Sequence, residues 1–227
     1  CELQSGIEVY HPRFFNIPRA FKFFDGIFYF FSTIKTIFKI KRDFDFDIID
    51  SHFIYPDGFG AILLGKFFQR PVVITVRGTL RKLLTNPTIR SQIQYALSSS
   101  SQIITVCEDL KQAVLRRSAH VKKVDVIANG VDLRKFWPLD KKLARESLGI
   151  DTKSNVIISV GGLVERKGFH RVIEVLPDLK RIFPDILYII VGGASVEGNN
   201  EIVLRHMVKN LGLEDHVLFA GRQPHEK

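Results

Sequence analysis

The segment from Val156 to Phe169, VIISVGGLVERKGF, constrains the fold of this 227-residue chain more than any other. Its first five residues are rich in β-branched apolar side chains and show no alternation, which predicts a strand at Val156–Val160 buried on both faces. Apolar residues then recur at helical spacing at Phe169, Val172, Ile173, Leu176, Leu179 and Phe183. We therefore expect a strand, a turn and a helix in close succession.

The turn between this strand and this helix has the composition of an anion site. Gly161 and Gly162 let the backbone turn sharply and approach a ligand, and Lys167 and Gly168 open the helix. The first amide groups of a helix are free, and its dipole favours negative charge there. The alternative is an ordinary strand-to-helix turn with a solvated Lys167, and the local pattern alone favours it.

The charge of the chain indicates an anionic partner. Lys and Arg number 33 against 24 acidic residues, for a net charge of +9. Between Lys66 and Lys123 there are eleven basic residues against two acidic ones. A nucleotide, a phospholipid surface and a nucleic acid would each fit this charge, which cannot choose among them. Cys1 and Cys107 have neither metal nor redox spacing, which is typical of a reducing compartment.

In the first half of the chain, strands and helices alternate. We expect strands at 47–51, 72–76, 102–106 and 124–127, helices at 59–68, 88–97 and 108–117, and one edge strand within residues 2–11. This alternation predicts a parallel, doubly wound sheet with ligands at the carboxyl ends of the strands. The polar residues at those ends are His52, Arg77, Cys107 and Asn129.

A very aromatic helix is expected from Phe23 to Phe38. Its apolar stripe predicts packing against a sheet, and the alternative is a face that enters a membrane surface, with Lys35, Lys39, Lys41 and Arg42 near its end. The charged residues within 21–40 argue against a spanning helix.

The pattern of elements lapses around FWPLDKK, where we place a domain boundary between 1–140 and 141–227. The second domain repeats the alternation, with strands at 156–160, 187–191 and 217–219 and helices at 169–183 and 201–211. Three strands are few for a doubly wound sheet, so we expect this domain to be truncated.

Several stretches in order resemble one family. SVGGLVERKGFHRVIEVL, VIANGVDLRKFWP, YIIVGGASVEG, LGLEDHVLFAGRQPHE and DSHFIYPDGFGAILLGKFFQRPVVITVRGT are similar to the nucleotide-sugar glycosyltransferases of the GT-B fold, retaining type, family 4 (group 1). The resemblance implies an α/β protein of two Rossmann-like doubly wound domains that face each other across a cleft. It also implies an acceptor held mainly by the first domain and a nucleotide-sugar donor held mainly by the second.

The resemblance places the donor diphosphate at the glycine turn. Gly161, Lys167 and Gly168 match the family motif, which carries an arginine where this chain has Gly162. We expect Arg166 to replace that cation in part. Gly193, at the end of a later strand, would admit the nucleotide.

On the acceptor side, the resemblance gives His52 a catalytic position that faces the transferred sugar or the acceptor, with a capping histidine as the alternative. Arg77 and Gly78 would clamp an acidic group of the acceptor, or Arg77 would form only a surface ion pair. Asn129 and Gly130 match the loop before the domain crossing, where both tolerate left-handed conformations.

The resemblance implies transfer of a sugar to a glycan or lipid-linked acceptor with retention, in the synthesis of cell-surface polysaccharide. No cofactor and no metal are expected. The protein would be cytoplasmic, with peripheral contact to the inner face of the plasma membrane. The family's paired glutamates and the start of its first domain have no counterpart here, so we expect this chain alone to be inactive. The alternatives are a basic module that binds anionic membranes or nucleic acid, and a nucleotide-sugar epimerase.

Overall fold

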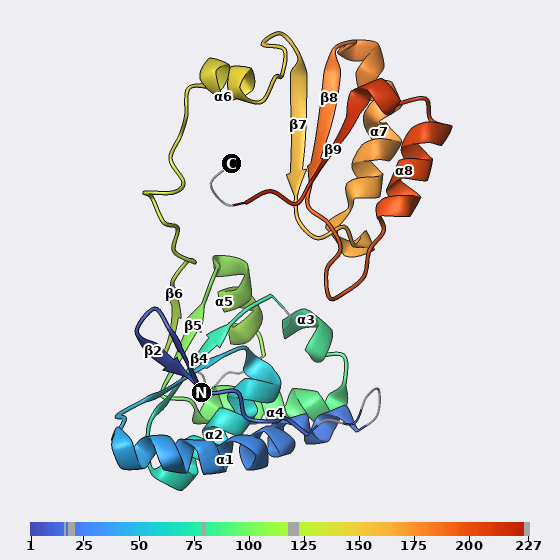
Figure 1. Cartoon of the computed structure of the whole chain (residues 1–227). Coiled ribbons are helices and arrows are strands. Elements are labelled where there is room, and N and C mark those ends of the chain that lie inside the picture. Colours follow the sequence, from blue (N-terminus) through green and yellow to red (C-terminus); the bar gives the residue numbers. More distant parts are fainter. Residues whose placement is uncertain (16, 18–20, 79, 118–122, 225–227) are drawn as a thin grey trace. The chain divides into compact units, whose positions relative to one another are not determined.

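The computed structural model describes residues 1–15, 17, 21–78, 80–117 and 123–224, and within these ranges nothing is said of the side chains of residues 81 and 82. The chain divides into two compact units, Cys1–Gly130 and Val131–Lys227. This division comes ten residues before the expected boundary at 140. Each unit is an α/β fold with its own parallel sheet (Figure 1).

The sheet of the first unit follows the order of the sequence. It contains β3 (Ile49–His52), β4 (Val72–Val76), β5 (Gln102–Thr105) and β6 (Val124–Val126), all parallel, in the order β3-β4-β5-β6. The four expected strands are thus confirmed. Ile74 and Ile103, on the two central strands, are at most 1% exposed and form the centre of the core.

The helices of the first unit connect these strands. They are α1 (Asp25–Asp43), α2 (Phe59–Phe68), α3 (Leu80–Leu83), α4 (Pro87–Ser99) and α5 (Glu108–Leu115), with short turns η1 (Lys22–Phe24) and η2 (Ile54–Gly58). The side chain of Asn86 accepts hydrogen bonds from the amides of Thr88 and Ile89, which fixes the start of α4. Only the short α3 was not expected.

The N-terminal residues form a hairpin, where one edge strand was expected. β1 (Glu2–Gln4) pairs antiparallel with β2 (Ile7–Val9) in a separate two-stranded sheet. Ser5 and Gly6 have φ values of 50° and 84°, and two consecutive positive φ values are typical of a tight hairpin turn. Ser-Gly is a weak turn signal, which explains why the pattern alone missed it.

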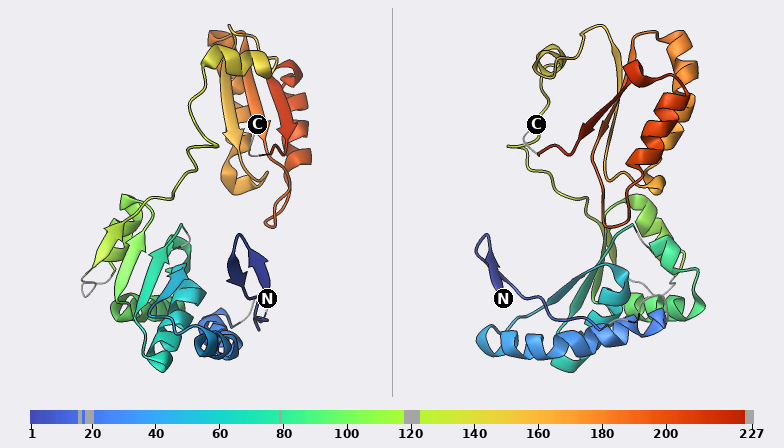
Figure 2. Two further views of the ribbon diagram at one scale, coloured as in Figure 1. Left: turned by 60° about the vertical axis from the view of Figure 1, so that its left-hand side comes forward. Right: turned by 45° about the vertical axis from the view of Figure 1, so that its right-hand side comes forward.

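The second unit has its two long helices on one face of its sheet. β7 (Asn155–Val160), β8 (Ile186–Val191) and β9 (Val217–Gly221) are parallel and follow each other in that order. α7 (Phe169–Ile182) and α8 (Glu201–Asn210) cover the same face (Figure 2). α6 (Lys141–Ser147) precedes the sheet, and the short turns are η3 (Glu165–Lys167) and η4 (Glu214–His216).

The prediction that Val156–Val160 is buried on both faces is wrong. Ile158 and Val160 remain 60% and 71% exposed. Among the described residues β7 has a neighbouring strand on one side only, and the two helices cover the other face of the sheet. An unbroken apolar run identifies a strand, but it does not say whether the strand lies at an edge.

Within the part of the chain that the structure describes, no helix combines the length and the apolar composition needed to cross a membrane.

Candidate functional site

The expected glycine turn joins two strands at very close range. Gly161 follows directly after β7, and its amide donates to the carbonyl of Val191 over 2.9 Å. A Cβ at Gly192 would lie 1.8 Å from the carbonyl oxygen of Gly161, and Gly192 has φ 143°. No residue with a side chain fits at position 192, because only glycine readily adopts this φ and a Cβ would overlap the Gly161 carbonyl. The carboxyl ends of β7 and β8 therefore form one compact backbone surface.

Lys167 lies against this surface. An ideal Cβ at Gly161 would meet Cε and Cδ of Lys167 at 3.7 and 3.8 Å, so the lysine side chain passes over the glycine. Gly168 adopts φ 75° and ψ 17° and ends η3 just before α7 begins. No side chain described in the structure caps the N-terminus of α7. A cation and a helix N-terminus without a side-chain cap thus occur together, as the sequence predicts for an anion site.

The surface beside Lys167 is hollowed and mostly basic. An open hollow of about 570 Å³ is lined by Glu165, Arg166, Lys167, Gly168, His170 and Arg171. Five of them come from η3 and the first turn of α7, and Gly168 lies between these two elements. A charged, hydrogen-bonding ligand such as a diphosphate suits these groups better than an apolar one does.

Arg166 has a partner of its own. Its Nε and Nη2 donate to the two carboxylate oxygens of Glu197, each over 2.5 Å. This hydrogen bonding raises the pKa of the Arg166 guanidinium. A ligand at Lys167 would have to share Arg166 with Glu197, so the expectation that Arg166 replaces the family arginine in part remains a prediction.

A neighbouring loop packs against Gly162, the position at which the resemblance to the family predicts an arginine. A Cβ at Gly162 would lie 2.9 Å from Cβ of Ser195, in the segment between β8 and α8. A larger side chain at Gly162 would require this loop to move, which explains why a glycine stands there. Ser195 carries no sequence signal that would have identified this contact.

Arg222 adds a cation that the sequence reasoning missed. It follows directly after β9, and its Nη2 donates to the carbonyl of Ala194. A Cβ at Gly193 would meet the Cγ and Nε of Arg222 at 3.1 and 3.2 Å. Gly193, predicted to admit the nucleotide, therefore has the Arg222 guanidinium beside it. The signal in the sequence is the arginine at the carboxyl end of the last strand.

In the first unit, three predicted residues meet at the carboxyl edge of the sheet. Nη2 of Arg77 lies 3.0 Å from Nδ1 of His52, and Nη1 of Arg77 donates to the side-chain oxygen of Asn129 over 2.9 Å. The three residues follow or end β4, β3 and β6. Cys107 is exposed and precedes α5, and no described contact joins it to this cluster.

The contacts of His52 fix its tautomer. Because Arg77 can only donate, Nδ1 must carry the lone pair, and the hydrogen lies on Nε2. Nε2 lies 3.3 Å from the carboxylate of Asp50. The reasoning from sequence missed Asp50, although residues two apart on a strand share a face.

Backbone strain adjoins His52. Phe53 has φ 74° and ψ 148°, a combination that residues with side chains rarely adopt. Such outliers gather at functional sites, where the surrounding structure holds them. Gly78 and Gly130, by contrast, have open space around their Cα atoms, and neither they nor Asn129 adopt the left-handed conformation that was considered for the crossing loop.

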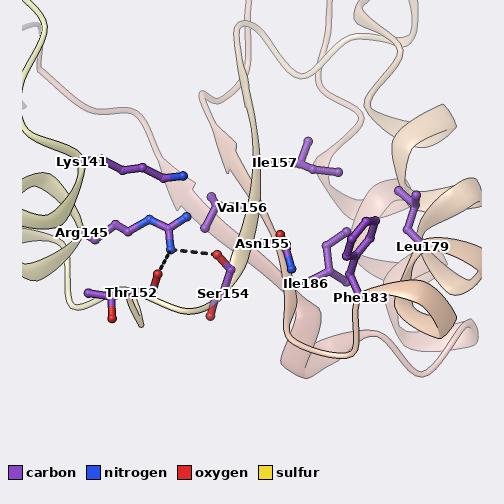
Figure 3. Close-up of a pocket in the computed structure, with 10 residues that line it drawn as sticks. All are labelled: Lys141, Arg145, Thr152, Ser154, Asn155, Val156, Ile157, Leu179, Phe183 and Ile186. Carbon is purple, nitrogen blue, oxygen red and sulfur yellow. Dashed lines mark hydrogen bonds between the residues drawn. The ribbon is translucent and has the colours of Figure 1, made fainter.

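A second hollow lies at the opposite end of the second sheet. It measures about 520 Å³, and Figure 3 shows its lining. Nη1 of Arg145 donates to the carbonyls of Asp151, Thr152 and Ser154 over 3.0, 2.7 and 2.8 Å. This arginine therefore fastens α6 to the segment before β7. The hollow belongs to the amino ends of the strands and is separate from the Lys167 site.

Among the described residues, no group of three or more His, Cys, Asp or Glu side chains is placed to hold a metal ion.

Two solved structures have a similar fold. Sucrose-phosphate synthase from Thermosynechococcus elongatus matches with a TM-score of 0.71 at 20% identity, covering 93% of this chain and 53% of the other. Anabaena Alr3699/HepE, solved in complex with UDP, matches with a TM-score of 0.70 at 21% identity, covering 85% of this chain and 52% of the other. These likenesses establish the GT-B fold.

Two relatives by sequence are glycosyltransferases by name. The putative teichuronic acid biosynthesis glycosyltransferase TuaC of Bacillus subtilis is 26% identical over 183 residues, which is 79% of this chain and 46% of the relative. The D-inositol 3-phosphate glycosyltransferase of Segniliparus rotundus is 33% identical over 107 residues, which is 47% of this chain and 24% of the relative. The chain thus spans less than half the length of these relatives.

Two family models together match nearly the whole chain. The model described as Glycosyltransferase Family 4 matches residues 4–135, and the model described as Glycosyl transferases group 1 matches residues 140–227. The first match alone covers more than half of the chain. The glycine turn with Lys167 and the cluster around His52 therefore lie in a chain that belongs to the group 1, family 4 glycosyltransferases.

Proposed function

We propose that the full-length protein transfers a sugar from a nucleotide-diphosphate sugar to a glycan or lipid-linked acceptor with retention of configuration. The observation that carries this proposal is Lys167, which lies over Gly161 beside the uncapped N-terminus of α7. Cleavage of the sugar–phosphate bond leaves additional negative charge on the departing nucleoside diphosphate. A fixed cation and oriented amides stabilise that charge as it develops, which lowers the barrier to transfer.

The nature of the donor finds support among the structural neighbours. Anabaena Alr3699/HepE was solved in complex with UDP and, separately, with UDP-glucose. In this chain, the nucleotide would lie beside Lys167 and approach the backbone of Gly162 and Gly193 on the sides that Ser195 and Arg222 leave free. Arg166 would contribute a further, partly neutralised positive charge. We propose that neither a metal nor a cofactor takes part.

The acceptor side is assigned to the His52 cluster. In the tautomer set by Arg77, His52 carries its hydrogen on Nε2, 3.3 Å from the Asp50 carboxylate, and the transferred sugar or the acceptor would share or displace that contact. The Arg77 guanidinium already contacts His52 and Asn129, so an acidic acceptor group would bind Arg77 by sharing or displacing those contacts. Gly78 and Gly130 are exposed beside Arg77 and Asn129 and leave this edge open.

The cellular role that we propose is the synthesis of cell-surface polysaccharide by a cytoplasmic protein. The name of the Bacillus subtilis relative, which refers to teichuronic acid, supports this role. A lipid-linked acceptor would bring the protein into peripheral contact with the anionic inner face of the plasma membrane.

The decisive experiment measures donor binding and transfer in the full-length protein. UDP-glucose is expected to raise its melting temperature, and Lys167→Ala is expected to weaken donor binding about tenfold and to lower kcat about a hundredfold. Lys180→Ala on α7 is the matched control, because Lys180 lies in the last turn of the same helix.

Three outcomes would contradict the proposal. Binding of UDP and UDP-glucose by Lys167→Ala as strong as that of the unchanged protein would show that Lys167 forms no anion site. Sugar interconversion without any acceptor would indicate an epimerase. Tight binding of oligonucleotides that competes with UDP-glucose would indicate a nucleic-acid module.

A further inference from the structure

Helix α1 exposes a face on which aromatic and basic residues alternate. Residues on this face recur every three or four positions, at Phe24, Phe28, Phe31, Lys35, Phe38 and Arg42. Phe31 and Phe38 are 66% and 51% exposed, which is far more than a helix packed into a core would leave. Most large aromatic side chains are well buried, so this face requires an explanation.

The exposed aromatic surface extends beyond α1 itself. Phe67 on the adjacent α2 is 52% exposed, and its ring centroid lies 5.5 Å from that of Phe38. Phe15, which precedes α1, is 61% exposed and its ring lies 5.0 Å from that of Phe28. We call the five exposed rings the aromatic face: Phe15, Phe24, Phe31, Phe38 and Phe67.

The opposite side of α1 is held firmly, which fixes the aromatic face outward. α1 and α2 cross so closely that a Cβ at Gly26 would lie 2.5 Å from the ring of Phe59, and a Cβ at Gly60 would lie 2.5 Å from the ring of Tyr29. The hydroxyl of Tyr55 donates to the carbonyl of Lys22 over 2.5 Å, just before the helix. Figures 1 and 2 show α1 lying beside α2 along its length.

The charges on this side select the partner. Lys35 stands between Phe31 and Phe38. Arg42 follows one turn after Phe38, and its Nε donates to the exposed Asp43 carboxylate over 3.3 Å, so Lys35 carries the larger part of the charge argument. An apolar helical face with Lys and Arg among its rings suits the boundary between anionic headgroups and acyl chains. A second copy of the chain would bring Lys35 and Arg42 against like charges, which disfavours self-association through this face.

We infer that the aromatic face docks α1 flat on an anionic lipid bilayer, with the rings among the acyl chains and Lys35 and Arg42 at the phosphate groups. The inference assigns the proposed peripheral membrane contact to a defined surface of this chain. Its biological purpose, access to a lipid-linked acceptor, rests on the proposed function. Binding to lipid is nevertheless measurable without any transfer reaction.

The test is co-sedimentation of the 227-residue chain with vesicles of phosphatidylcholine, with and without phosphatidylglycerol. Binding is expected to require phosphatidylglycerol and to weaken as salt is added. Phe31→Ser and Phe38→Ser are each expected to weaken binding about tenfold, because each removes a ring that lipid would bury. Lys35→Gln is expected to weaken it about fivefold.

Matched controls come from the second unit. Ile202 on α8 is 72% exposed, and Lys209 lies in the last turn of that helix, so Ile202→Ser and Lys209→Gln remove similar groups elsewhere. Both are expected to bind vesicles as the unchanged chain does. Circular dichroism should show that all variants are folded, since each altered side chain is exposed.

The inference is overturned if the chain binds neither kind of vesicle, or if the controls lose as much binding as the α1 variants. It is also overturned if Phe31→Ser abolishes a dimer, or binding to an oligonucleotide, instead of vesicle binding. Lys167→Ala is expected to keep vesicle binding, and Phe31→Ser in the full-length protein is expected to keep UDP-glucose binding. Failure of the membrane contact is therefore distinguishable from failure of the proposed function.

Discussion

The guanidinium of Arg77 contacts Nδ1 of His52 over 3.0 Å and thereby places the imidazole hydrogen on Nε2. This contact makes Arg77 a positioning residue for His52, in addition to any contact it makes with the acceptor. Both residues stand at the carboxyl edge of the first sheet, at the ends of neighbouring parallel strands.

The first prediction concerns this contact. Arg77→Ala should lower the share of the Nε2–H tautomer of His52, because the donor to Nδ1 is lost and, among the described contacts, Asp50 near Nε2 alone still favours that tautomer. Nitrogen chemical shifts of the His52 ring measure the tautomer directly, and kcat of the full-length protein is expected to fall at least tenfold. Arg90→Ala on the exposed side of α4 should change neither quantity. An unchanged tautomer in Arg77→Ala would show that the contact does not fix it.

The second prediction concerns Gly192. Gly192→Ala should lower the free energy of unfolding of the second unit by about 3 kcal/mol or more, since the new methyl group would overlap the Gly161 carbonyl. Urea unfolding followed by circular dichroism measures this loss. Gly212 also has a positive φ, 62°, but open space around it, so Gly212→Ala should cost only about 1 kcal/mol. Equal losses would mean that conformation alone matters.

The third prediction compares the two arginines of the donor side. Arg222→Ala should weaken UDP-glucose binding about tenfold in the full-length protein, because Arg222 lies against Gly193 without a described carboxylate partner. Arg166→Ala should weaken it less, because Glu197 already neutralises Arg166. Calorimetric titration measures both. A larger effect at Arg166 would mean that donor binding breaks the pair with Glu197.

The fourth prediction concerns alkaline pH. Burial raises the pKa of Tyr55 to about 12, so the folded protein keeps a proton that the unfolded chain releases near pH 10. Stability from this group is therefore complete below pH 10 and is lost as pH rises toward 12. In Tyr55→Phe, the melting temperature should fall less steeply between pH 10 and 12. At neutral pH the free energy of unfolding should be about 1 kcal/mol lower, because the hydrogen bond to the Lys22 carbonyl is lost.

Tyr95→Phe controls for the general effect of alkali, because Tyr95 is more than a third exposed. If Tyr55→Phe and the unchanged chain lose stability in parallel above pH 10, another group governs the alkaline transition.

The positions of the strands and helices were predicted well from the sequence, whereas the burial of their side chains was predicted less well. Apolar runs located every long strand, and the parallel order brought His52, Arg77 and Asn129 together as expected. The exposure of Val160 was not predicted, because a central strand and an edge strand can have the same run of apolar residues.

Contacts between distant segments could not be predicted from spacing. Ser195 fills the space beside Gly162, and Arg222 lies over Gly193, although 33 and 29 positions separate them along the chain. Local patterns record the conformation of a residue and its nearest neighbours, whereas these contacts depend on how loops at the ends of three strands fold over each other. The strained backbone conformation of Phe53 likewise could not be predicted from local sequence patterns.

The three carbonyl contacts of Arg145 indicate where a chimaera of two related proteins should be joined. They tie α6 to the segment before β7, and Asp140 caps that helix through the amides of Lys142 and Leu143. A chimaera joined between α6 and β7 would separate the arginine from its acceptors, whereas a junction before Asp140 would transfer the second sheet together with α6 and the Arg145 contacts that hold it. Recombination within this family should therefore succeed upstream of that aspartate.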